Sequence, residues 1–193
     1  MKIKQAIISD VTERYINNLL ALWELSTKHS SWYSDAHIVI KDIAKDYNVS
    51  VEDVAYVTAT LSPALSWRAN IESTRAFFDE WHGRQTSNRQ TAYGTNVGKC
   101  TQYMFGVRSG TPTGQKVSAF YSNLLGNYDV VTLDRHAIRA ARWGVRNLES
   151  ESGEQKICGQ EFAVVENAYR RAASMVGVDV AVFQATIWVL FCQ

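Results

Sequence analysis

The sequence predicts an all-α protein, and three observations indicate this class. Apolar residues recur at helical spacing along most of the chain. Several of these runs begin at serine or aspartate, the residues that cap helix N-termini. The composition is 46% hydrophobic and 20% charged over 193 residues, which suits one globular domain with room for two lobes.

The first half of the chain is expected to form four helices. Asp10 and Glu13 have the spacing of a capping box, so the first helix should begin there. Ser50 and Asp53 repeat the spacing at the third helix, which should end near Pro63 because proline disfavours helix at the residue before it. The expected helices begin at residue 10 and then cover 35–47, 50–62 and 66–81.

The second half begins with a polar segment, residues 82–96, that predicts a loop. Helices are then expected over 97–105, 115–125, 135–143, 157–176 and 180–191. Residues 128–133 are rich in β-branched side chains and should be extended. The charged residues 148–154 should link the helix over 135–143 to the last two helices.

The segment from Thr113 to His136 carries the chemistry. Gly114 opens a helix with Lys116 in its first turn, and Asp134 follows eighteen positions later at the start of the next helix. The first helix travels about 16 Å, and the extended return over 128–133 spans about 20 Å. Lys116 and Asp134 are therefore expected to lie side by side.

These residues resemble the helix-hairpin-helix DNA glycosylase superfamily, which includes endonuclease III and 8-oxoguanine glycosylase. The family pattern is L-P-G-V-G-x-K-[TV]-A followed by V-D-x-H. The matching positions here are Gly114, Lys116, Val117, Asp134, His136 and, further on, Arg139. The resemblance implies helices from two lobes around a cleft, with the hairpin at about 105–126. It implies a DNA N-glycosylase that flips out and excises a damaged or modified base.

The strong part of the resemblance covers residues 110–140. Leu61, Ser62 and Asn70 loosely match another family segment. Three features depart from the family pattern. Pro112 replaces the first hairpin glycine, Ala64 stands near the position of the glutamine that many members insert into the duplex, and the four-cysteine iron–sulfur motif is absent.

Asp134 is the expected catalytic carboxylate, since it could stabilise the positive charge that develops on the sugar. Its alternative role is a plain N-cap for the helix over 135–143. Lys116 could attack the sugar as a neutral amine and add lyase activity, or it could contact a phosphate. The expected DNA-contacting residues are Thr113, Gly114, Gln115, Ser118, Arg135, His136 and Arg139, with the glycine turn and helix N-terminus approaching a phosphate.

Three aromatic residues are candidates for the wall of a base pocket: Trp67, Tyr103 and Trp188. Aromatic side chains are core material first, so the alternative for each is a core role.

Positive charge is concentrated around the motif. Residues 81–146 contain nine basic and two acidic residues, a net charge of +7, which leaves −6 for the remainder of a chain whose net charge is only +1. No acidic residue occurs from Trp81 to Tyr128. This segregation predicts a phosphate-facing surface, with chance clustering on solvated faces as the alternative.

No signal peptide or membrane span is expected, so the predicted location is intracellular, cytoplasmic or nucleoid-associated. Cys100, Cys158 and Cys192 have no metal-binding spacing, and each is expected to be a small buried residue. No metal or other cofactor is expected. The expected partner is DNA, duplex or single-stranded, without an obligate protein partner.

Two other functions stay open. One is a base-modifying transferase that uses the same base-flipping scaffold, and the other is a non-catalytic DNA-binding module.

Overall fold

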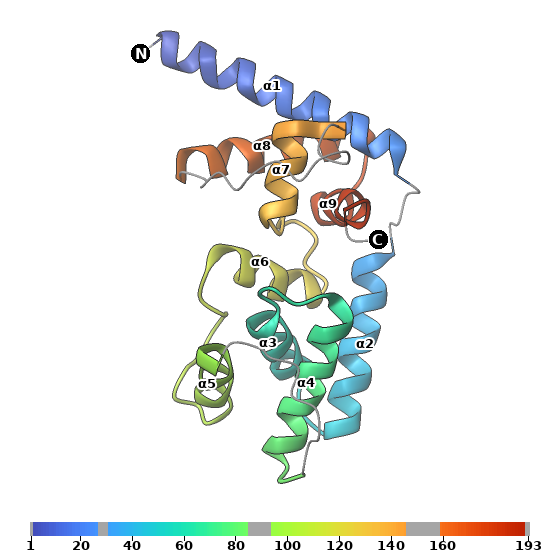
Figure 1. Ribbon diagram of the computed structural model, residues 1–193, viewed down its shortest axis with the longest axis vertical. Coiled ribbons are helices and arrows are strands. Elements are labelled where there is room, and N and C mark those ends of the chain that lie inside the picture. Colours follow the sequence, from blue (N-terminus) through green and yellow to red (C-terminus); the bar gives the residue numbers. More distant parts are fainter. Residues whose placement is uncertain (1, 27–30, 85–93, 146–158, 192–193) are drawn as a thin grey trace. The chain divides into compact units, whose positions relative to one another are not determined.

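The computed structural model describes residues 2–26, 31–84, 94–145 and 159–191. Every regular element within these ranges is a helix, which confirms the all-α prediction (Figure 1). The helices are α1 (Lys2–Leu25), α2 (Trp32–Tyr47), α3 (Val51–Leu61), α4 (Trp67–Trp81), α5 (Gly94–Met104), α6 (Gln115–Leu124), α7 (Arg135–Trp143), α8 (Gly159–Val176) and α9 (Val180–Val189).

Cap residues set several of these boundaries as expected. Ser50 and Asp53 form the predicted capping box at the start of α3, and Ser66 caps α4. The prediction that α1 begins at Asp10 is wrong, because the helix already runs from Lys2. Asp10 is exposed within the helix, and Glu13 forms an ion pair with Arg171 of α8 at 2.6 Å. An acidic pair three residues apart suits an exposed helix face as well as a cap.

The chain forms two compact units, and the boundary between them falls inside α2. Residues 1–33 and 128–193 form one, called here the terminal unit. Residues 34–127 form the other, the central unit.

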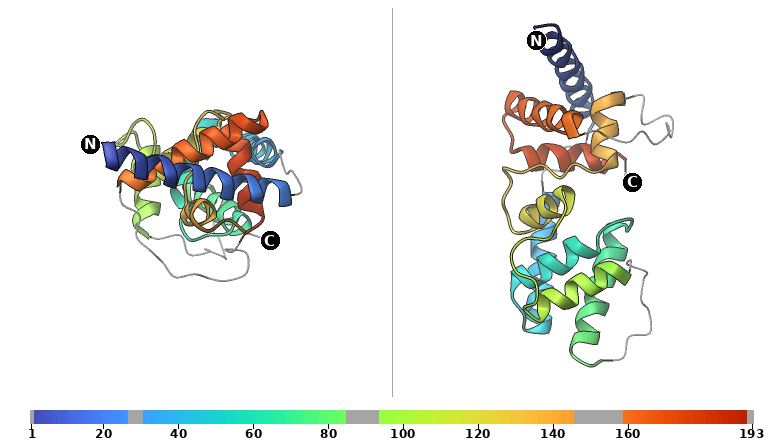
Figure 2. Two further views of the ribbon diagram at one scale, coloured as in Figure 1. Left: turned by 90° about the horizontal axis from the view of Figure 1, so that it is seen from above. Right: turned by 90° about the vertical axis from the view of Figure 1, so that its left-hand side faces the viewer.

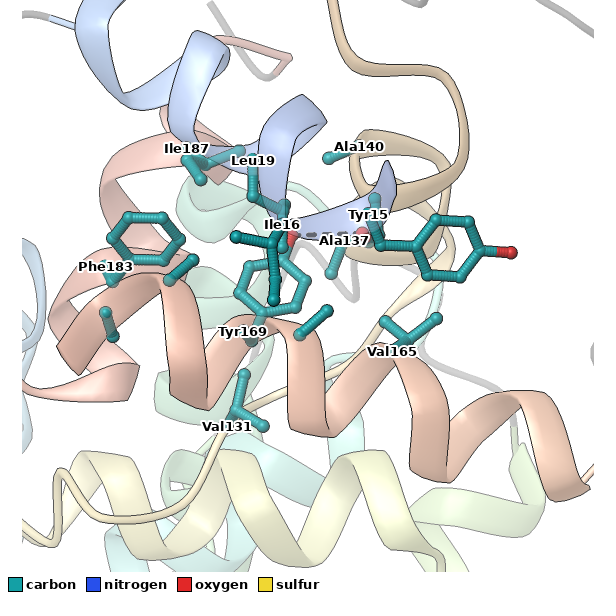
Figure 3. Packing of buried hydrophobic residues seen from close by; sticks show 14 of the residues in the cluster. Tyr15, Ile16, Leu19, Val131, Ala137, Ala140, Val165, Tyr169, Phe183 and Ile187 are labelled. Carbon is teal, nitrogen blue, oxygen red and sulfur yellow. Dashed lines mark hydrogen bonds between the residues drawn. The ribbon is translucent and has the colours of Figure 1, made fainter. Parts of the chain in front are cut away.

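In the terminal unit, α1 packs against α7 and α8, and α9 packs against all three. Tyr169 of α8 is fully buried at the centre of this core, among Ile16, Val165 and Phe183 (Figure 3). Its hydroxyl donates a 3.0 Å hydrogen bond to the carbonyl oxygen of Ala137 in α7. This bond satisfies the one polar atom of a large core side chain and fixes α7 against α8.

In the central unit, α3 packs against α4, α5 and α6 (Figure 2). Residues 54–61 of α3 are all buried, as expected for a helix covered on several sides. Residues 105–114 connect α5 to α6. Among the described residues, α5 and α6 contact α3 far more extensively than they contact each other.

Residues 128–133 contain a turn at 128–130 followed by irregular chain, with no strand. Val131, Thr132 and Leu133 are buried. The β-branched composition predicted an extended segment, and the turn at 128–130 departs from that prediction. Composition alone does not make a strand, which also needs a partner to complete its hydrogen bonds. The expected linker over 148–154 and most of the expected loop over 82–96 lie outside the described residues.

Within the described ranges, no helix is by itself long and apolar enough to cross a membrane. Residues Glu161–Val176 and Val180–Val189 reach the necessary length and composition only as a pair, which is bent by 99°.

Candidate active site

The predicted catalytic carboxylate, Asp134, lies in the terminal unit at the N-cap of α7. Its backbone is extended, and its Oδ1 accepts a 2.8 Å hydrogen bond from the backbone N–H of Ala137. Its Oδ2 accepts a 3.1 Å hydrogen bond from the indole Nε1–H of Trp188 in α9. These two bonds fix both carboxylate oxygens, and each oxygen keeps a further lone pair for a ligand.

Aromatic side chains lie beside this carboxylate. Trp188 makes an edge-to-face contact with Trp32, with ring centroids 5.6 Å apart, and Trp32 in turn meets Tyr33 at 4.9 Å. Tyr33 also contacts Tyr128 at 6.1 Å. Trp32 and Trp188 are half-buried, so their rings are partly open to solvent. The result is a half-exposed carboxylate with indole rings next to it.

Asp134 affects the pKa of two buried tyrosines, Tyr33 and Tyr169. Burial raises the pKa of Tyr33, and the negative charge of Asp134 raises it further, whereas a hydrogen bond with Thr132 opposes the shift. Burial also raises the pKa of Tyr169 well above its ordinary value, and Asp134 adds to this effect. Asp134 forms no ion pair with the described basic residues. Both oxygens of Asp134 therefore accept hydrogen bonds, and no described cation pairs with them.

The basic residues of α7 divide into two groups. Arg142, in the last turn, donates two hydrogen bonds to Glu161 of α8 and serves the structure of the terminal unit. The predicted DNA-contacting residues lie nearer the start of the helix. Arg135 is exposed and donates to His136, whose ring stacks on Phe191 at 6.5 Å, and Arg139 is half-buried with no ion pair among the described residues.

The second predicted element, the glycine turn at α6, lies in the central unit. Gly114 is the N-cap of α6, with φ +102° and ψ 130°, a conformation that only glycine adopts without strain. It provides no side-chain cap, and no described side chain accepts from the N–H groups of the first turn. Thr113, Gly114 and Gln115 are exposed, and Lys116 and Ser118 are half-buried. Lys116 forms no ion pair with a described residue.

Lys116 belongs to the central unit and Asp134 to the terminal unit, so their expected proximity stays a prediction. Within the terminal unit, the structure brings Trp188 to Asp134. The other two expected pocket residues belong to the central unit. Trp67 is the first residue of α4, and Tyr103 stacks on Tyr56 with ring centroids 3.7 Å apart.

Sequence reasoning missed Trp32, which contacts Trp188. Its only local signal is the Trp32-Tyr33 dipeptide at the start of α2.

The basic stretch also divides between the units. Arg84, Lys99, Arg108 and Lys116 belong to the central unit, and Arg135, Arg139 and Arg142 to the terminal unit. Arg84 pairs with Asp79 at 3.5 Å, so part of this charge is used within the fold. Arg89 and Arg146 lie outside the described residues.

Cys100 is a buried free cysteine, as expected, and burial raises the pKa of its thiol to about 12. Cys158 and Cys192 lie outside the described residues. In the part of the chain that the structure describes, no three His, Cys, Asp or Glu side chains come together in a group that could hold a metal ion.

One family model matches residues 1–193, and its description is "Family of unknown function (DUF7178)". The chain belongs to this family. No curated protein and no solved structure matches the chain.

Proposed function

We propose that this member of DUF7178 is a DNA N-glycosylase that extrudes a damaged or modified base and excises it with Asp134 as the catalytic carboxylate. The observation that carries the proposal is the setting of Asp134. It is fixed by Ala137 N–H and Trp188 Nε1–H, half-buried, and without a basic partner among the described residues. A fixed carboxylate next to the sugar stabilises the positive charge that develops as the glycosidic bond breaks.

The rings beside Asp134 support a base-extrusion mechanism. An extruded base needs aromatic or apolar walls against which to stack. Trp188 and Trp32 are half-buried, and Trp188 touches the proposed catalytic group itself. The same indole would orient the carboxylate and border the base.

The N-terminus of α6 supports DNA anchoring. Its first-turn N–H groups have no side-chain cap, and a helix N-terminus with available N–H groups favours a phosphate. Lys116 in that turn has two roles open to it. As a neutral amine, its Nζ would form a bond to the anomeric carbon while the base leaves with the bonding electrons, which leads to an imine and strand cleavage. As an ammonium it would contact a phosphate, and water would be the nucleophile.

The experiment is incubation of the purified protein with duplex and single-stranded oligonucleotides that carry a panel of damaged and modified bases, with and without borohydride. The readout is the intact mass of DNA and protein. Base loss is the expected result. A trapped covalent adduct that disappears in Lys116→Ala, but not in Lys99→Ala, would assign the nucleophile. Unchanged DNA on every substrate would contradict the proposal, and a gain in base mass would indicate a transferase.

A non-catalytic DNA-binding module is the second candidate. It is favoured by the 2.8 Å bond from Ala137, because an N-cap role accounts for Asp134 at this position without any chemistry. Such a module would bind DNA through Gly114 and the arginines of α7 and would not depend on the carboxylate. In either case the protein would work where DNA is found, inside the cell.

A further inference from the structure

A cavity of about 410 Å³ lies within the central unit between α4 and α5. Phe77, Glu80 and Trp81 line it from α4, and Val97, Thr101 and Phe105 line it from α5 and the residue that follows. Trp81 and Phe105 meet edge-to-face, with ring centroids 4.9 Å apart. Small-molecule sites have cavities of about 300–1,000 Å³ with mostly apolar walls and a few polar groups.

Phe105 is held in place although it is exposed. Phe105 is 70% exposed and Val107 is 74% exposed, the two highest values among the large apolar residues described as exposed. The turn between them is fixed: Gly106 has φ +71° and donates to Tyr103 O, and Val107 N–H donates to Gln102 O, both at 2.9 Å. This turn ends α5 as a Schellman motif does. An exposed ring on a fixed turn is a platform for stacking.

Arg108 extends the platform with positive charge. Its Nε donates a 2.8 Å hydrogen bond to the side chain of Gln102, the residue whose carbonyl also accepts from Val107 N–H. Arg84 follows Trp81 at the end of α4 in a second turn of the same kind, in which Arg84 N–H donates to Asp79 O at 2.8 Å. The stretch from Trp81 to Tyr128 contains five basic residues and no acidic one. This charge complements phosphate.

The cavity itself is lined by a negative charge rather than by positive ones. Glu80 is the one charged residue among those that line it, and two of the lining rings, Trp81 and Phe105, stand at the C-terminal ends of two helices. A helix C-terminus carries partial negative charge and attracts hydrogen-bond donors. The ligand should therefore combine a flat ring, an amino donor and a nearby phosphate.

We propose that this α4–α5 cavity binds an unpaired nucleobase with an exocyclic amino group, such as cytosine or adenine, within a single-stranded nucleic acid. The base stacks on Phe105 and Trp81, and its amino group donates to the Glu80 carboxylate. Arg108 contacts the phosphate backbone of the strand, whereas Arg84 is paired with Asp79. Stacking on exposed aromatic rings beside basic residues is how proteins hold single strands, and a carboxylate that accepts from an amino group reads cytosine. The cavity belongs to the central unit and Asp134 to the terminal unit, and the proposal does not depend on glycosylase activity.

The test is fluorescence anisotropy of the 193-residue chain with labelled single-stranded oligo-dC, oligo-dA and oligo-dT. Oligo-dC and oligo-dA should bind more tightly than oligo-dT, because thymine has no exocyclic amino group. Phe105→Ala should weaken binding of all three by about tenfold. Glu80→Ala should remove the preference over oligo-dT. Phe105 and Glu80 are exposed, so both variants should fold, which their circular dichroism checks.

Two control substitutions match these variants. Ile38→Ala truncates an apolar side chain that is 57% exposed on α2, and Glu72→Ala removes a carboxylate of α4 that pairs with Arg68. Both should bind like the wild type. Equal affinity of wild type and folded Phe105→Ala would overturn the proposal, as would equal affinity for oligo-dT and oligo-dC. A failed base-excision assay would not bear on this result, because anisotropy measures affinity for the strands and requires no base release.

Discussion

Two helix N-termini in this protein are built in opposite ways. α7 begins with Asp134, whose side chain caps the Ala137 N–H and is itself held by Trp188. α6 begins with Gly114, which has no side chain, an unusual backbone conformation and no cap for the first-turn N–H groups. The first terminus satisfies one of its own donors, the Ala137 N–H, and presents a fixed carboxylate. The second leaves its donors available to an external anion. In the proposed function, chemistry would belong to α7 and phosphate anchoring to α6.

Among the variants that test this difference between α6 and α7, Gly114→Ala should change stability the most. A Cβ at Gly114 would meet no atom within 4 Å, so any cost comes from the backbone conformation at φ +102°. We expect the free energy of unfolding to fall by about 1–3 kcal/mol, and DNA affinity to fall with it, because the turn would move. Denaturant titration measures the first quantity and anisotropy the second.

Gly98→Ala is the matched control, since Gly98 is exposed within α5, also has open space around it and has no positive φ. It should stabilise the protein by about 0.5–1 kcal/mol. Equal stability of the two alanine variants would show that α6 does not require glycine at its start.

A smaller effect is expected from removal of the cap at α7. Asp134→Ala should cost about 1 kcal/mol in the free energy of unfolding. Asp134→Asn should cost much less, because asparagine is an equally good N-cap. Thermal and denaturant unfolding of the two variants measure this difference. Similar losses in both would mean that the negative charge itself stabilises the fold.

The stability of the protein in acid should depend on the ion pair between Arg142, in the last turn of α7, and Glu161 of α8. Hydrogen bonds from Arg142 and then Tyr15 lower the pKa of Glu161, against the opposing effect of burial. A carboxyl whose pKa is lower in the folded state stabilises the fold above its unfolded pKa of about 4.3, and this contribution is lost as pH falls through the folded value. Melting temperature should therefore drop below about pH 4 in the wild type, and Glu161→Gln should flatten that drop.

Glu166→Gln is the control for the pH measurement, because Glu166 pairs with Arg170 on the same helix at a more exposed position. The fall in its melting temperature at acidic pH should follow that of the wild type. If the melting temperature of Glu161→Gln falls at acidic pH as it does in the wild type, the contact between Arg142 and Glu161 does not govern stability at acidic pH.

The smallest effect is expected from Lys116→Ala on the salt dependence of duplex DNA binding. Loss of one phosphate contact should lower the slope of log affinity against log salt by about 0.9. Lys45→Ala, which changes an exposed lysine of α2, should leave the slope unchanged. A wild-type slope in Lys116→Ala would remove Lys116 from the phosphate-binding role.

Local signals account for what the sequence could predict. The cap at Ser50, the glycine before α6 and the aspartate before α7 each act on neighbouring residues, so the start of each helix could be predicted from a few positions. The same locality explains the failure at Asp10, where the capping spacing occurs inside a longer helix.

Contacts between distant residues could not be predicted in this way. Trp188 and Asp134 are 54 positions apart, and their hydrogen bond depends on how α9 packs against α7. The sequence identified both residues but not the bond between them. The contact of Trp32 with Trp188 has the same cause, because it requires the start of α2 to meet the end of α9.

The proposal places chemistry at α7 and phosphate anchoring at α6. The most direct test measures DNA affinity and base release on one substrate for two variants, Asp134→Asn and Gly114→Ala. Asp134→Asn should bind like the wild type and release base at least about a hundredfold more slowly. Gly114→Ala should bind weakly and still release base at saturating DNA. Asp179→Asn is the control, because Asp179 stands at the N-cap of α9 without a capping bond. Undiminished base release by Asp134→Asn would contradict the account.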